Sequence, residues 1–256
     1  MIIRENNDEA ILIEQHEHAL ISGQFVYHWN RNAFLRPDLK SSVEYAVTNH
    51  DRSWIPLDRK PVFLKENDLA SFINYPLRKK LKAYKDGVSQ LVEEDIYAGY
   101  LISRHYASFF KGKKDILGNE FMEEEKERQE KLKQAAAFRE LNLSEEEEEF
   151  HFDLLQLCDN LSLYVCMNEW GAGKEKEVQW FRDGFPQKLT PFNSRRFYAR
   201  WVSETEVKLD PYPFTAERVY MSIPYKRLNI KDIRNDNLQQ LYRETPYAYH
   251  PVSFTL

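Results

Sequence analysis

The chain has 256 residues, of which 42% are hydrophobic and 30% are charged, as in an ordinary globular protein with one large domain or a core and a smaller appended unit. The net charge of −5 and a pI near 5.9 provide no basic field for nucleic acid, so no nucleic-acid partner is expected. A signal-peptide pattern and an apolar run near the ~20 residues of a membrane span are both missing, which predicts a cytoplasmic protein without a membrane partner.

The first part of the chain contains short predicted elements. In chain order they are a β-hairpin over residues 1–14 with its turn at Asn6-Asn7-Asp8, a helix over about 15–29, a helix from Ser41 to His50, and a loop-like stretch over 52–75. Ala19, Val26 and Trp29 lie on one stripe of the first predicted helix, at the spacing of an amphipathic helix.

The middle of the chain predicts three more helices. One runs from about Leu91 to Phe110, and a highly charged one covers about 120–141. The third begins after Ser144 and ends before Gly171. Five glutamates follow Ser144 directly. Serine is a good capping residue, and the glutamates place negative charge at the positive end of the helix dipole.

After residue 171 the hydrophobic period changes from that of a helix to that of strands. Apolar and polar residues alternate over 197–201, 207–209 and 219–223, as in strands with one buried face. The predicted fold is therefore mainly α, with a helical core over residues 1–170 and an antiparallel β-rich extension over residues 171–256 packed on it.

Metal-type ligands occur on helical stripes that are otherwise apolar. They are His18, the pair His50-Asp51, His105 and Asp159. Imidazole and carboxylate together suit divalent transition metals, and carboxylates extend the range to Mn²⁺ or Mg²⁺. His16 is an alternative first ligand, because residues two apart cannot share one helix face. The following Ala19 and Ser22-Gly23 favour His18.

The order of these ligands resembles the HD superfamily of metal-dependent phosphohydrolases. His50-Asp51 follows Tyr45-Ala46-Val47, and Asp159 lies in Cys-Asp-Asn-Leu-Ser, similar to the doublet and the last-ligand helix of that superfamily. The flanking patterns, Gln-x-x-His-Ala-x-x-Ser-Gly and Leu-Gln-Leu-Cys-Asp-Asn-Leu-Ser-Leu, look like an uncharacterised bacterial family in or near it.

The resemblance implies an HD-like helical core and a phosphohydrolase that acts on a small phosphorylated metabolite or nucleotide. His18, His50, Asp51 and Asp159 would hold a divalent ion (Mn, Fe, Mg, Ni, Co or Zn). Asp51 would also orient or deprotonate the attacking water, and His105 would bind a second metal or steady the phosphate.

The residues after the doublet differ from the superfamily pattern. Many HD hydrolases place a lysine there, whereas this chain has Arg52-Ser53-Trp54. Arg52 or Arg104 can replace the missing charge, because a guanidinium binds phosphate well. The adjacent histidine pair of dinuclear members is also missing, since Tyr106 follows His105.

Two alternative functions remain open at the level of sequence. His16, His18 and His105 also fit a di-iron HD protein that uses oxygen. The unusual flank of the doublet fits a non-catalytic protein that keeps the fold and binds a ligand or partner through its aromatic β face. A homo-oligomer is compatible with either function.

Overall fold

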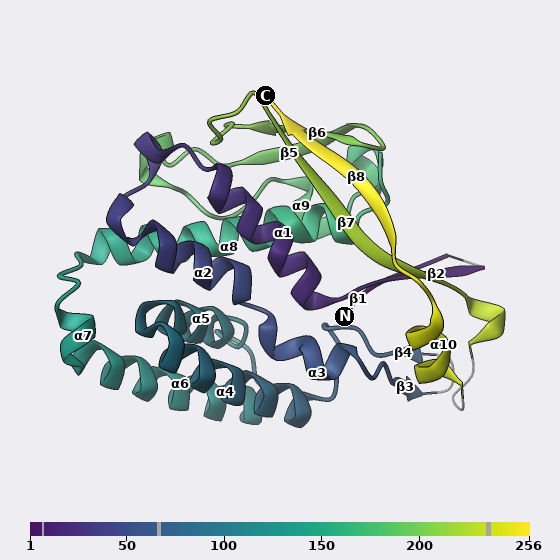
Figure 1. Ribbon diagram of the computed structural model, residues 1–256, viewed down its shortest axis with the longest axis horizontal. Helices are drawn as coiled ribbons and strands as arrows, with labels where there is room; N and C mark the ends of the chain where they lie inside the picture. The colour runs from purple at the N-terminus through teal and green to yellow at the C-terminus, as the bar shows by residue number, and fades with distance from the viewer. Residues whose placement is uncertain (7, 66–67, 234–236) are drawn as a thin grey trace.

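Helices dominate the structure, and one curled sheet covers one side of them (Figure 1). The computed structural model describes residues 1–6, 8–65, 68–233 and 237–256. In Figure 1 the sheet lies at the upper right and the helices α4 to α7 at the lower left, with α1, α2 and α8 between them. Within the described ranges, no helix is long and apolar enough to cross a membrane.

The α-helices are α1 (Gln15–His28), α2 (Lys40–Asn49), α3 (Ile55–Asp58), α4 (Leu77–Glu94), α5 (Ile96–Ser108), α6 (Ile116–Gln134), α7 (Ala136–Arg139), α8 (Glu145–Met167), α9 (Gln179–Arg182) and α10 (Leu238–Glu244). Short 3-10 turns are η1 (Arg31–Ala33), η2 (Pro37–Leu39), η3 (Arg52–Trp54), η4 (Lys174–Lys176), η5 (Thr190–Phe192) and η6 (Ile230–Asp232). The strands are β1 (Ile2–Glu5), β2 (Glu9–Ile13), β3 (Phe63–Lys65), β4 (Asp68–Leu69), β5 (Tyr198–Ser203), β6 (Glu206–Asp210), β7 (Arg218–Asn229) and β8 (Ala248–Thr255).

The main sheet has six strands in the order β1-β2-β7-β8-β6-β5, so both ends of the chain contribute to it. The hairpin of β1 and β2 confirms the predicted hairpin, although Asn7 of its predicted turn lies outside the described residues. The prediction of purely antiparallel β structure is wrong, because β6 and β8 pair in parallel. Strand β8 inserts between β6 and β7 and runs antiparallel to β7 and parallel to β6.

Three predicted helices agree with the structure and form its centre. Helix α1 packs against α2, α8 and β7, and α8 also contacts α2, α5 and β1. The predicted start of α8 is confirmed: Ser144 and Glu147 form a reciprocal capping box. Helices α1 and α2 approach closely at Gly23, where an added Cβ would meet the hydroxyl oxygen of Thr48 at 2.2 Å. This approach brings the helix with His18 next to the helix that ends at His50.

The prediction of a helix that begins near Leu91 is wrong at its start. A separate helix, α4, precedes it and buries Leu81, Tyr84, Val88 and Leu91 at helical spacing. Asp95 has an extended backbone and separates α4 from α5. Its carboxylate accepts hydrogen bonds from the backbone N–H groups of Tyr97 and Ala98, both at 2.9 Å, and so caps α5.

We expect Asp95→Ala to lower the free energy of unfolding by about 1 kcal/mol, because two backbone donors at the start of α5 lose their acceptor. Urea unfolding followed by circular dichroism measures this difference. The control is Glu93→Ala, an exposed position near the end of α4, for which a change within about 0.5 kcal/mol is expected. Equal losses in the two variants would contradict the capping role.

Candidate metal centre

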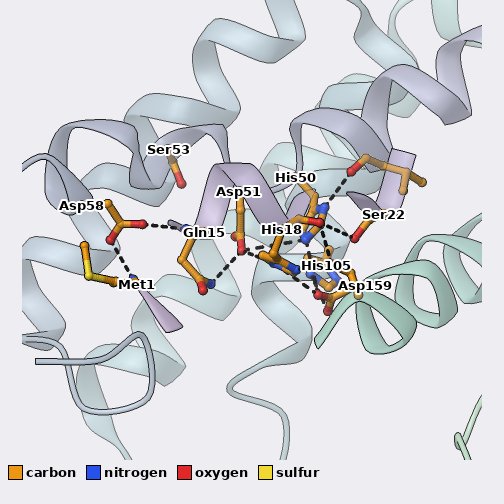
Figure 2. Close-up of polar contacts among 12 residues, drawn as sticks. Met1, Gln15, His18, Ser22, His50, Asp51, Ser53, Asp58, His105 and Asp159 are labelled. Carbon is orange, nitrogen blue, oxygen red and sulfur yellow. Dashed lines mark hydrogen bonds and ion pairs between the residues drawn. The ribbon is translucent and has the colours of Figure 1, made fainter. Parts of the chain in front are cut away.

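Five buried side chains from the central helices converge on one point, and we call them the cluster (Figure 2). They are His18 from α1, His50 and Asp51 at the end of α2, His105 from α5 and Asp159 from α8. None of the five is more than 8% exposed. Two overlapping groups within the cluster can hold a metal ion: His18, His50 and Asp51, and His50, His105 and Asp159.

Several pairs of polar atoms in the cluster lie close enough to share a metal ion. Nε2 of His18 is 3.0 Å from Oδ2 of Asp51, and Nε2 of His50 is 3.4 Å from Oδ1 of Asp159. Nε2 of His105 is 3.6 Å from Oδ2 of Asp159. Two ligands that share one ion at about 2.1 Å lie about 3.0–3.4 Å apart for angles between 90° and tetrahedral.

Hydrogen bonds fix how two of the histidines face the carboxylates. Nδ1 of His50 donates to the carbonyl oxygen of Val47 at 2.7 Å, so Nε2 is the atom that faces the cluster. For His18, the hydroxyl of Ser162 donates to the His18 carbonyl and accepts from Nδ1 at 3.0 Å, again leaving Nε2 for the cluster. A second partner on the far ring nitrogen is the usual support of a metal-bound histidine.

Several polar atoms of the cluster lack a hydrogen-bond partner among the described residues. They are Nε2 of His50 and both ring nitrogens of His105. Leaving a buried polar atom unpaired costs about 1–3 kcal/mol. In the neutral tautomer, the Nε2 lone pair of His50 points at two carboxylates, which is unfavourable unless a cation lies between them. The donor set therefore fits a metal ion.

The charges of the cluster shift the pKa values of its members. Burial lowers the pKa of His50, but the Asp51 and Asp159 carboxylates outweigh burial and raise it from 6.5 to about 9. Burial raises the pKa of Asp159, but the three imidazoles, His50 foremost, outweigh it and lower that pKa to about 2. Burial lowers the pKa of His105 to about 4. His105 is therefore neutral near pH 7, which is the form that binds metals.

Polar contacts outside the cluster hold the doublet in place (Figure 2). The side-chain amide of Gln15 donates to Oδ2 of Asp51 at 2.8 Å, and the Gln15 backbone N–H donates to Asp58 at 2.7 Å. The hydroxyl of Tyr106 donates to the carbonyl of His50 and lies 2.6 Å from the Ser53 hydroxyl. The turn after α2 is thus tied both to the start of α1 and to α5.

A pocket of about 320 Å³ opens onto the cluster, and Asp51, His105 and Asp159 lie in its wall. Two lysines, Lys80 and Lys113, also line this pocket. Neither lysine forms an ion pair within the part of the chain that the structure describes; the Lys80 ammonium donates to the Phe72 carbonyl at 3.1 Å. Burial, followed by the charge of Lys113, lowers the pKa of Lys80. The pocket therefore combines metal-type ligands with two uncompensated positive charges.

The structure brings His18, His50, Asp51, His105 and Asp159 together and leaves the other predicted residues outside. His16 is not in the cluster, so His18 is the histidine that α1 contributes. Arg52 pairs with Glu94 at 2.5 Å and Arg104 with Glu149 at 2.6 Å, and neither arginine lines the pocket. The two predicted phosphate-binding arginines are thus engaged elsewhere on the protein.

Sequence reasoning missed much of the pocket wall, including the polar residues Gln15, Lys80, Lys113 and Asn160. Lys80 belongs to the basic run at 78–80, which the apolar spacing of α4 places on a helix. That spacing is the signal that identifies α4, and with it the helix that carries a lysine to the pocket. Lys113 lies in a connection without a comparable signal.

A family model described as a protein of unknown function, DUF3891, matches residues 1–230 of the chain. This range contains all five residues of the cluster and both pocket lysines. No curated protein and no solved structure matches the chain.

We expect the metal-free protein to lose stability as the pH rises from about 6.5 to about 9. The folded state raises the pKa of His50, so its stabilising contribution is complete below about 6.5 and is lost as the imidazolium deprotonates. The loss should be on the order of 1–3 kcal/mol. Urea unfolding of chelator-treated protein at several pH values measures it. His50→Gln should show a flatter profile over this range, and the same slope in both proteins would contradict the assignment.

Proposed function

The chain belongs to the DUF3891 family of proteins of unknown function, and we propose that it is a metal-dependent phosphohydrolase acting on a small phosphorylated molecule. One observation carries this proposal: the cluster forms part of a pocket wall that also holds two lysines, for which no carboxylate partner lies among the described residues. Metal-type ligands beside such ammonium groups suit a phosphate ester, which is an anion with oxygen atoms for both.

The ligand set favours a first-row transition metal over Mg²⁺. Three imidazoles and two carboxylates form a mixed nitrogen and oxygen set, whereas Mg²⁺ prefers oxygen ligands and retains several waters. The order His18, His50-Asp51 and Asp159 resembles that of the HD superfamily, and an HD-like core is part of our proposal. Fe, Mn, Co, Ni and Zn are therefore the candidate ions.

A divalent ion held by the cluster would polarise a phosphoryl oxygen and lower the pKa of water. The residues of the chain supply the other functions. Lys80 and Lys113 attract and orient the phosphate, in the role that the superfamily pattern gives to a lysine after the doublet. Asp51 is held by the Gln15 amide and is positioned to accept a proton from the attacking water.

Asp159→Asn tests the centre of the proposal. Protein purified without added metal should contain a divalent ion in stoichiometric amount by elemental analysis, and the variant should lose most of it, because the carboxylate that faces all three histidines is gone. Phosphomonoesterase activity should fall in parallel by at least about a hundredfold.

The matched control for this experiment is Asp153→Asn, which removes a carboxylate from the same helix outside the cluster. It should keep both metal and activity. Equal metal in Asp159→Asn and wild type would contradict the metal centre. Two irons per chain with a mixed-valence signal would favour the oxygen-dependent alternative over hydrolysis.

Lys80→Ala tests the phosphate site separately from the metal. We expect kcat/KM for a phosphomonoester to fall roughly tenfold to a hundredfold, the size of one charged hydrogen bond, with unchanged metal content. Lys79→Ala removes an exposed lysine of the same helix that lies outside the pocket and should change kcat/KM less than about twofold. Equal effects of the two substitutions would contradict a phosphate-binding role for Lys80.

A further inference from the structure

We propose that the substrate carries a planar aromatic ring on the side of the leaving group, and that Phe72, Ile73 and Trp180 bind this ring at the mouth of the pocket. The inference rests on the proposed function, because it takes the phosphate to lie at the cluster. We call these three residues the rim.

Two of the three large apolar side chains of the rim are unusually open to solvent, and Phe72 is half-buried. Ile73 is 57% exposed and Trp180 is 53% exposed, and both line the pocket that reaches the cluster. They come from segments far apart in the sequence, the loop before α4 and helix α9. The rings of Phe72 and Trp180 meet edge to face, with centroids 6.4 Å apart. Exposed apolar side chains gathered at the mouth of a polar pocket indicate a ligand surface.

The residues of the pocket are ordered by depth. Asp51, His105 and Asp159 are buried, Lys80, Asn160 and Phe72 are half-buried, and Ile73, Trp180 and Lys113 are exposed. A phosphate monoester has one doubly charged end and one end formed by its leaving group. With the charged end at the lysines and the cluster, the leaving group extends toward the rim.

The chemistry of the rim favours a ring over a polyol. The side chains of Phe72 and Ile73 offer no hydrogen-bonding group, so hydroxyls placed against them would lose their bonds to water. A planar ring can instead stack on the Trp180 indole or meet its edge. Phe109 continues the aromatic wall inward, with its ring 4.6 Å from that of His105.

The volume of the pocket limits the ligand further. About 320 Å³ is at the small end of ligand pockets, which range over about 300–1,000 Å³. One ring and one phosphate suit this volume better than an extended polymer does. The inferred substrate class is therefore the small phosphomonoester with a single aromatic group.

The test compares benzyl phosphate with propyl phosphate, because both release a primary alcohol and differ mainly in the ring. For the metal-loaded protein we expect kcat/KM to be about tenfold higher for benzyl phosphate. Trp180→Ala should lower kcat/KM for benzyl phosphate by about tenfold and so remove this preference, and Trp180→Phe should retain most of it. Tyr220→Ala, which removes an exposed aromatic residue outside the pocket, is the control and should behave as wild type.

Binding of benzylphosphonate and propylphosphonate, measured by calorimetry on the metal-loaded protein, separates the two proposals. Equal affinities and equal turnover of the two compounds would overturn the aromatic preference and leave the hydrolase intact. If neither ester is hydrolysed while benzylphosphonate binds about tenfold more tightly in wild type only, the hydrolase proposal fails and the ring site stands. Failure of both phosphonates to bind would overturn the ring site.

Discussion

The structure depends on the burial of five titratable groups in the centre of its helices. A buried charge is costly unless an opposite charge or a metal compensates it, and the cluster places three imidazoles against two carboxylates. The five residues come from four elements: α1, the end of α2, which supplies both His50 and Asp51, α5 and α8. The attraction between the imidazoles and the carboxylates therefore holds these helices together, in addition to their apolar packing. The close approach at Gly23 lets the helices of His18 and His50 pack tightly, and this brings the two imidazoles near each other.

The five cluster residues could be found from the sequence because each lies on a recognisable helix or directly after one. His18 and Asp159 occupy helix faces whose other members are apolar. A polar residue at such a position is predicted to be buried and to belong to a functional site. The lysines could not be found in the same way. Lys80 is one of several cations in a basic run, and only the contact of α4 with the rest of the core decides which cation faces the pocket. Arg52 and Arg104 have the right charge near the ligands in sequence, but glutamates on neighbouring elements bind them.

The sheet shows a similar division between local and long-range information. Alternation of apolar and polar residues locates β5, β6 and β7 because it depends only on one buried face. It carries no information on which strands become neighbours or in which direction they run. The insertion of β8 between β6 and β7 is decided by contacts over the whole domain, and it makes the sheet mixed. The ring site depends equally on such long-range placement, since Phe72 and Trp180 meet only in the folded protein.

Strand β2 has a consequence for the order in which the protein can be assembled. It leads directly into α1 and pairs with β7, with Glu9 opposite Asn229. Contacts between residues this far apart form slowly, because a long loop must close first. Strand β7 also follows all five cluster residues in the chain, so a ribosome has made them before β2 finds its partner. A newly made chain therefore presents their imidazoles and carboxylates to the cell before the helix that bears His18 is anchored.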